Sequence, residues 1–123
     1  MWNPALKQYI AETAIGANLI VKFGSTDDYA VLAAASTDKL MGVSGNVAGG
    51  AGERVDIIKS GIADVVAGGT FARGDLLTSD AAGKAIVAAP GAGTNARIIG
   101  IAEASAVLND IVPMLLAPCS MQG

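Results

Sequence analysis

The strongest constraint on the fold is a motif that occurs once in each half of the chain. The two copies and the segments around them share one order: a polar turn with a small apolar run, then the motif, then an acidic residue leading into an apolar run. These echoes lie at residues 28–35, 39–44 (KLMGVS) and 56–58 in one half, and at residues 83–89, 97–102 (RIIGIA) and 110–112 in the other. A chain that repeats strand, turn and strand predicts a small pseudo-symmetric β-structure. It does not indicate a cleft built from unique catalytic side chains.

Short apolar runs bounded by turn residues continue along most of the chain, with almost no helical periodicity. Gly61 interrupts one run and predicts a bulge or bend. Pro113 lies inside the last run and predicts that this strand is at a sheet edge, because proline cannot donate to a ladder. About nine or ten short strands with turn signals at roughly 8–12-residue intervals predict an all-β fold, a small pseudo-repeated β-barrel of the β-tulip or β-clip type. We expect strands near residues 19–24, 29–34, 40–44, 53–59, 62–66, 76–78, 84–87, 98–102 and 111–116.

The two ends of the chain differ in composition from the middle. Residues 1–16 hold two of the aromatic residues and few turn residues, which predicts an N-terminal arm ahead of a barrel domain at residues 17–118 and a C-terminal tail at 119–123. Asn3-Pro4 would suit the start of a short helix with Leu6, Tyr9, Ile10 and Thr13 along one side. The competing interpretation, which we adopt, is an extended arm that lies on a neighbouring protein.

The composition favours a protein that binds other protein. Charged residues form 15% of the chain, against about 25% in an average globular protein, and hydrophobic residues form 52% with only one Trp, two Tyr and two Phe. A small domain with so few charges exposes apolar area, which a partner subunit usually covers. Lys and Arg are scattered and the net charge is −3, so we expect no nucleic-acid partner.

Membrane association and export are not expected either. No apolar stretch approaches the roughly 20 residues that span a bilayer, and the start of the chain lacks the basic-then-apolar order of a signal peptide. The sequence therefore predicts a protein made in a cytoplasm.

Catalytic, metal and cofactor chemistry find little support in the residues. The chain has no histidine, which removes the commonest general base and metal ligand. Cys119 is the single cysteine, so no internal disulfide is possible. Asp27, Asp28, Asp38 and Asp80 lack the register of a calcium loop and are interpreted as turn residues. Gly83-Lys84-Ala85 lacks the hydroxyl of a phosphate loop. We expect no catalytic residue, no metal and no cofactor.

One alternative is a swinging-arm carrier domain. Lys39 follows Asp38 at a turn, which is similar to the lysine that carries lipoate or biotin in small barrels with a doubled strand pattern. Its echo in the second half is Arg97, which argues against this interpretation. A secreted carbohydrate-binding barrel is a further alternative, but it would need aromatic platforms for sugar stacking.

Taken together, the segments resemble the small capsid decoration, or cement, proteins of tailed bacteriophages. The resemblance covers almost the whole chain in order, and each piece alone is weak. The pieces are an Asn-Pro arm, IVKFG at 20–24, LMGVS at 40–44, GERVDII at 52–58, SGIA at 60–63, AGG at 67–69, RGDLLTSD at 73–80, GKA at 83–85, IIGIA at 98–102 and DIVP at 110–113.

The resemblance implies a structural virion protein. Such proteins bind the outside of the icosahedral shell, commonly as homotrimers, and clamp neighbouring subunits of the major capsid protein. A tail or head–tail component remains a possibility within the virion. The residues expected to contact the capsid through the arm are Trp2, Pro4, Leu6 and Tyr9, with Trp2 as an anchor because tryptophan is enriched at binding hot spots. The loop residues Asn46, Gly49, Gly50, Pro90 and Gly91 are expected at trimer or capsid contacts.

Overall fold

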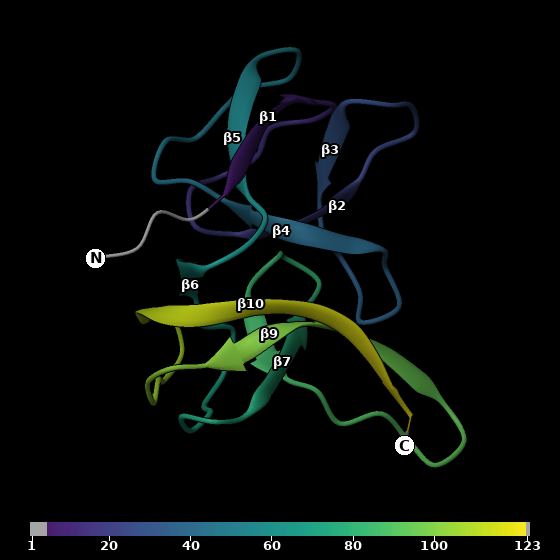
Figure 1. The fold of residues 1–123 in the computed structure, drawn as a ribbon, viewed down its shortest axis with the longest axis vertical. Helices are drawn as coiled ribbons and strands as arrows, with labels where there is room; N and C mark the ends of the chain where they lie inside the picture. The colour runs from purple at the N-terminus through teal and green to yellow at the C-terminus, as the bar shows by residue number, and fades with distance from the viewer. Residues whose placement is uncertain (1–4, 123) are drawn as a thin grey trace.

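The fold consists of two five-stranded units that follow one another along the chain. The computed structural model describes residues 5–122, and all of its regular elements there are strands (Figure 1). The first unit contains β1 (Leu6–Ala11), β2 (Ile20–Phe23), β3 (Tyr29–Leu32), β4 (Leu40–Ser44) and β5 (Arg54–Ile58). The second contains β6 (Ile62–Val66), β7 (Leu76–Ser79), β8 (Ala85–Val87), β9 (Asn95–Ala102) and β10 (Ile111–Gln122). The all-β small-barrel prediction is confirmed.

The two units have the same strand connections. The first closes into a barrel in the order β1-β3-β2-β4-β5, and the second forms a sheet in the order β6-β10-β9-β7-β8. In the first unit β1 pairs with β3 in parallel, and in the second a parallel bridge between Ala67 and Ala85 joins the end of β6 to β8. Register pairs also correspond: Val21 faces Gly42 as Leu77 faces Gly100. The repeat predicted from residues 39–44 and 97–102 is therefore a repeat of structure.

Each unit buries a matching set of side chains, because alternate residues of its strands point inward. β5, for example, exposes Arg54 and Asp56 and buries Val55 and Ile57. The first core consists of Tyr9, Ala11, Ile15, Val21, Ala30, Met41, Val55 and Ile57. The corresponding positions of the second unit, all buried, are Val65, Ala67, Phe71, Leu77, Ala85, Ile99, Val112 and Met114.

A corner of the same shape occurs four times, at residues 12–18, 46–52, 68–74 and 103–109. Each corner ends in a left-handed residue, namely Asn18, Gly52, Gly74 or Asn109, with φ of 59°, 82°, 90° and 71°. Asn and Gly are the residues that adopt this conformation at least cost. The corners lie together in pairs, through the bridges between Ile15 and Gly49 and between Phe71 and Ala106. Small or amide residues at these positions therefore set the path of all four chain reversals.

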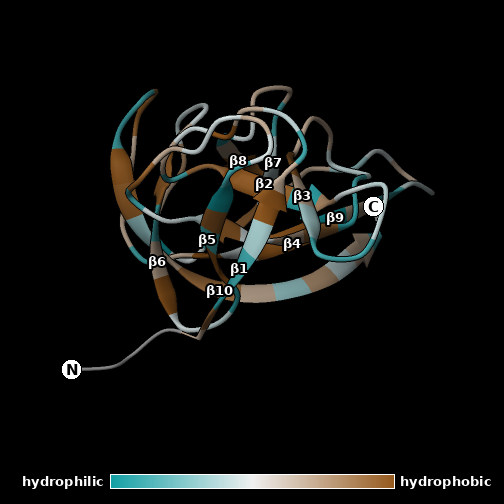
Figure 2. Cartoon of the chain, turned by 90° about the horizontal axis from the view of Figure 1, so that it is seen from above, coloured by the Kyte–Doolittle hydropathy of each residue, from teal (hydrophilic) through white to brown (hydrophobic). Residues whose placement is uncertain are grey.

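Strand β4 joins the two units. All five of its residues are buried, and in Figure 1 it lies across the middle of the molecule between the two units. Met41 belongs to the core of the first barrel, whereas Leu40 and Val43 belong to a core that includes the second unit. Backbone hydrogen bonds from Ile20 N to Gly83 O (2.7 Å) and from Arg97 N to Ser36 O (2.7 Å) also cross this junction. In Figure 2 the hydrophobic colour is concentrated in the strands, whereas many of the connecting loops are pale or teal.

The structure corrects the predicted position of Pro113. Strand β10 is an interior strand, since it pairs with β6 on one side and β9 on the other. The Pro113 carbonyl accepts a hydrogen bond from Glu103 N (3.1 Å), and Glu103 lies one residue beyond the end of β9. The Pro113 nitrogen therefore also faces the β9 side, at a point where β9 has ended, and this is why proline is tolerated. N and O of one strand residue point to the same side, so the missing N–H costs no ladder bond between paired residues.

The predicted boundaries of the arm and the tail also differ from the structure. Residues 6–11 are extended, not helical, but they form β1 of the barrel, paired with β5 from Leu6 to Ile10. At the other end, β10 continues to Gln122 and pairs with β9 from Cys119 onward after a shift in register. Gly61 (φ 87°) lies where the chain passes from one unit to the other, a bend and not a bulge.

Gly83 provides a test of the junction. Its φ is 74°, and a methyl group on its Cα would lie about 3.0 Å from the Ile20 carbonyl oxygen and 2.5 Å from Leu32 Cδ1. We predict that Gly83→Ala lowers the free energy of unfolding by roughly 2–4 kcal/mol, because backbone strain and overpacking add. Gly93→Ala is the matched control: its φ is 79° and no atom lies within 4 Å of the added methyl, so about 1 kcal/mol is expected. Urea unfolding of both variants measures the difference, and equal losses would contradict a packed junction at Gly83.

Candidate functional site

The outer face of the second unit carries an apolar row that crosses four strands. Leu76 faces Ile101, Ile101 faces Leu115, and Leu115 faces Ile62, so these side chains lie side by side on one face of β7, β9, β10 and β6. Leu76 and Leu115 are each 37% exposed, and Ile62 and Ile101 are half-buried. We call these four residues the outer row.

The surface beside the outer row is partly apolar and partly acidic. Two residues along β10 from Leu115, Pro113 lies between Glu103 and Asp64, both exposed. Ile111, which is 57% exposed, faces half-buried Val66. Apolar area of this continuity on a small chain is typical of a surface that another protein covers.

A groove of about 420 Å³ lies where the two units meet. Leu6 and Ile58 of the first unit and Ile62 and Pro113 of the second line its apolar part, with Asp56 and Asp64 at its sides. Asn46 also lines the groove. The N-terminal strand and the loop after β4 therefore contribute to one surface.

The first unit has a distinct cluster of lysine and aromatic side chains at one end of its barrel. Lys59 Nζ donates to the Tyr9 hydroxyl (2.7 Å) and lies 5.1 Å from the centroids of both the Tyr9 and Phe23 rings. Lys7 Nζ lies 4.8 Å from the Tyr9 ring and pairs with Asp28 (3.0 Å), whose hydrogen bond and charge raise the pKa of Lys7. Phe23 is 52% exposed. We call Lys7, Phe23, Asp28 and Lys59 the lysine–aromatic end.

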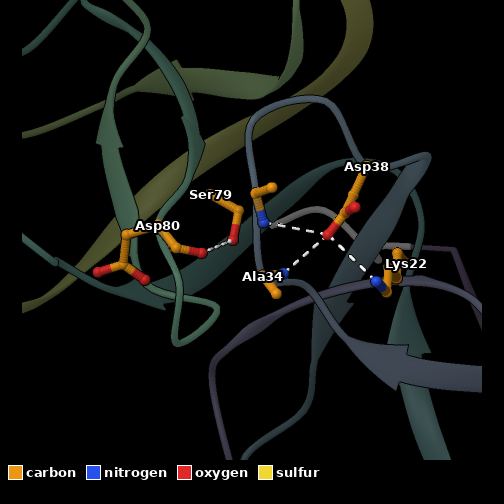
Figure 3. Close-up of polar contacts among 6 residues, drawn as sticks. Lys22, Ala34, Asp38, Ser79 and Asp80 are labelled. Atoms are coloured by element: carbon orange, nitrogen blue, oxygen red, sulfur yellow. Dashed lines mark hydrogen bonds and ion pairs between the residues drawn. The ribbon is translucent and has the colours of Figure 1, made fainter.

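Asp38 holds the turn that leads into β4 (Figure 3). Its carboxylate accepts hydrogen bonds from Ala34 N (2.8 Å) and Ala35 N (3.0 Å) and lies 3.3 Å from Lys22 Nζ. Burial disfavours the charged form, but the bonds from Ala34, Lys22 and Ala35 together outweigh it and hold the pKa of Asp38 below its usual value. Figure 3 also shows Ser79 Oγ donating to the Asp80 carbonyl across the junction from this turn (2.9 Å). The polar contacts here are those of a structural turn.

Comparisons with known proteins show that this chain is similar to structural proteins of phages. A family model described as phage cement protein matches residues 4–112. The chain belongs to the phage cement protein family. Among solved structures, the head fiber gp8.5 N base of bacteriophage phi29 is similar, with a TM-score of 0.68, 18% identity, and coverage of 97% of this chain and 98% of that one. A search of curated protein sequences gives no match. The predicted resemblance is confirmed, and the chain is a capsid-associated structural protein of a phage.

The residues predicted for the arm of this cement protein fall into three groups. Trp2 and Pro4 lie outside the described residues. Leu6 is 54% exposed on β1, where it lines the groove between the units. Tyr9 is 4% exposed, and its ring packs inside the first barrel with only its hydroxyl bonded to Lys59. Tyr9 is therefore a core residue of the first barrel.

The predicted loop residues lie on different units. Asn46 is exposed, whereas Gly49 is buried in the bridge to Ile15 and Gly50 donates to the Glu53 carboxylate. Pro90 and Gly91 lie between β8 and β9 of the second unit, half-buried and exposed respectively. The structure brings Asn46 together with Leu6 at the groove, and it gives no such association for Pro90 and Gly91.

The residues weighed for other chemistries have local roles. Lys39 is exposed, and its backbone carbonyl accepts from Phe23 N (3.2 Å), while Asp38 pairs with Lys22 instead. Asp80 accepts from Ala82 N and Lys84 N in the turn before β8. Among the described residues no group of three His, Cys, Asp or Glu side chains could hold a metal. No helix in the described part of the chain is long and apolar enough to cross a membrane.

The outer row was missed from the sequence. Its four residues come from four strands, and Ile62, Leu76, Ile101 and Leu115 look like core residues when each strand is read alone. The available signal was the internal repeat, since a row that is buried in one unit can be exposed in the other.

The pH dependence of stability tests the roles of the carboxylates of Glu12 and Asp38. Glu12 accepts from Ser25 N (2.8 Å) and Ser25 Oγ (2.7 Å), which lowers its pKa from 4.5, and the pKa of Asp38 is lowered from 3.8. A lowered folded-state pKa gives stability that is complete above the unfolded value and is lost as pH falls through the folded value. We predict that the stability contributed by Glu12 and Asp38 is constant from pH 7 to about 5 and decreases below about pH 4.5, so the thermal unfolding midpoint should fall there. Asp38→Asn should be less stable at pH 7 yet lose less on acidification, as followed by thermal unfolding; a pH dependence identical to that of the wild type would contradict this.

Proposed function

We propose that this cement protein binds the outside of the icosahedral capsid and stabilises it by clamping neighbouring subunits of the major capsid protein, as a homotrimer made in the cytoplasm of the bacterial host. The role is structural and not enzymatic. Membership of the phage cement family is the observation that carries the proposal. The low charge content and the exposed apolar side chains support it, since both suit a surface that is covered in the assembled particle.

The first-unit side of the groove, with Leu6 and Asn46, is our candidate for capsid contact. Leu6 is 54% exposed at its rim, Asn46 lines it, and Val47 beside Asn46 is 74% exposed. Trp2 and Pro4 precede Leu6 by a few residues, so the proposed arm would begin at this surface. One such contact is weak alone, but a trimer presents three of them at once, and the raised effective concentration converts modest contacts into tight attachment.

Truncation separates the contact role of the first residues from their role in the fold. We predict that removal of residues 1–4 and, separately, Leu6→Asp weaken binding to expanded empty shells by at least about tenfold while the thermal unfolding midpoint stays close to that of the full chain. Removal of residues 1–10 should instead unfold the protein, because it deletes most of β1 and buried Tyr9. Co-sedimentation with shells and thermal unfolding measure the two effects.

Leu108→Asp serves as the control for Leu6→Asp. Leu108 is 60% exposed, comparable to Leu6, but lies on a corner of the second unit away from the groove residues. It should bind shells normally. Full binding by both the truncated chain and Leu6→Asp would overturn the proposed contact surface, and no binding by the full chain would overturn the proposed function itself.

A further inference from the structure

We propose that the outer row of the second unit is covered by a second copy of this chain, and that the lysine–aromatic end of that copy's first unit is the surface that covers it. The inference rests on the proposed homotrimer and deepens it, because it names the two surfaces that would meet.

The chain already contains a version of the outer row that is covered for most of its length. The corresponding residues of the first unit are Leu6, Ile20, Val43 and Ile58, which face one another in the same register across β1, β5, β4 and β2. Ile20 and Val43 are fully buried, and they share a core with residues of the second unit, with Ile58 packed against it. Their counterparts Leu76 and Ile101 are exposed and half-buried. Leu6, at the end of the first row, is 54% exposed and lines the groove. The part of the row formed by Ile20, Val43 and Ile58 is thus covered in the first unit, whereas its counterparts Leu76, Ile101 and Leu115 are, among the described residues, less buried.

The surface that covers the first row lies at one end of the second unit. Ala63, Ser79, Gly83 and Leu116 are all buried there. Gly83 touches the row directly, since its carbonyl accepts from Ile20 N (2.7 Å), and Ala63 and Leu116 belong to the same core cluster as Ile20 and Val43. Within the chain, then, an outer row packs against the end of the next unit.

The first unit has the corresponding end, and there it is exposed. By strand register, Lys7, Phe23, Asp28 and Lys59 occupy the positions of Ala63, Ser79, Gly83 and Leu116. Phe23 is 52% exposed, and the Lys7 and Asp28 side chains are 55% and 64% exposed. Each chain therefore has one uncovered row and one uncovered end in its described part.

The charged residues beside these two surfaces differ from those at the junction inside the chain. Asp64 and Glu103 flank the outer row, whereas the corresponding residues of the first unit, Gln8 and Gly45, are uncharged. Lys7 and Lys59 lie at the exposed end, whereas the buried end has Ala63 and Leu116. Asp28 also lies at the exposed end and pairs with Lys7 (3.0 Å), and Asp56 lies beside the first row at the position of Pro113. Lys59 is therefore the lysine that would meet the added acidic residues Asp64 and Glu103, which favours association of the two free surfaces.

The arrangement that follows is a ring. The row lies on the second unit and the end lies on the first, so each contact is head-to-tail, and head-to-tail contacts close into rings when the rotation between copies permits. Three chains would place six similar units around such a ring.

Two variants and their mixture test the proposal. We predict that the wild-type chain has three times its 12.2-kDa mass in sedimentation equilibrium, and that Leu115→Asp and Phe23→Asp are each single subunits with the circular dichroism of the wild type. Val107→Asp is the control, at a position 56% exposed and outside both surfaces, and it should stay trimeric. Mixed together, Leu115→Asp and Phe23→Asp should form a one-to-one dimer, because the intact row of the Phe23 variant meets the intact end of the Leu115 variant.

Other results would overturn the inference. A trimer that persists in Leu115→Asp excludes the outer row, and two single-subunit variants that fail to form a dimer on mixing exclude a row-to-end contact. A monomeric wild type excludes the ring. Shell binding by co-sedimentation is measured in parallel, so a chain that binds shells without using the row refutes this inference and leaves the proposed function in place.

Discussion

The burial of β4 on both of its faces is the constraint on which the rest of the molecule depends. Met41 fills the first barrel, while Leu40 and Val43 fill the junction with the second unit. Between them, Gly42 has no side chain, and a Cβ there would collide with the Ile58 carbonyl of β5. The first barrel closes through this close approach, and its outside becomes a core surface for the second unit. A strand that serves two cores leaves little freedom in how the units sit relative to each other.

The repeat can be recognised in the sequence because a glycine that the packing requires stands at the centre of each copy of the motif. Gly42 and Gly100 occupy the same place in KLMGVS and RIIGIA, and a Cβ on Gly100 would meet the Leu115 carbonyl as one on Gly42 would meet that of Ile58. The third echo was misaligned. Asp110 accepts the backbone bond from Ala67 that Glu53 accepts from Ala11, so Asp110 corresponds to Glu53 and not to Asp56. An acidic residue before isoleucine is too common a pattern to fix a register.

What the sequence could not provide were the long-range pairings. Residues 6–11 were interpreted as an arm because nothing local shows that β1 pairs with β5, nearly fifty positions later. The edge position predicted for Pro113 was wrong for the same reason. Pro113 is tolerated because the neighbouring strand β9 has already ended beside it, and only the pairing of β9 with β10 shows this. Leu6 and Tyr9 are both predicted from the sequence to contact the capsid, but only Leu6 is exposed, whereas Tyr9, three residues on, lies inside the barrel. The strand period places them on opposite faces. The candidate surface depends on these pairings, which is why the outer row was not foreseen.

The differences between the units are as informative as their likeness. Where the second unit has Ala63, Ser79, Gly83 and Leu116, which are small or apolar and suit a dry junction, the first has Lys7, Phe23, Asp28 and Lys59. Charges in the dry junction would bear a large desolvation cost, so the end that is always buried has none. At the exposed end of the first unit, lysines keep the surface hydrated, and their ammonium groups lie over the rings of Tyr9 and Phe23. Such an end can stay soluble alone and still accept an apolar partner. In the proposed ring, the substitutions that distinguish the two halves would give the chain a direction, with one junction fixed within it and a second pair of surfaces for association.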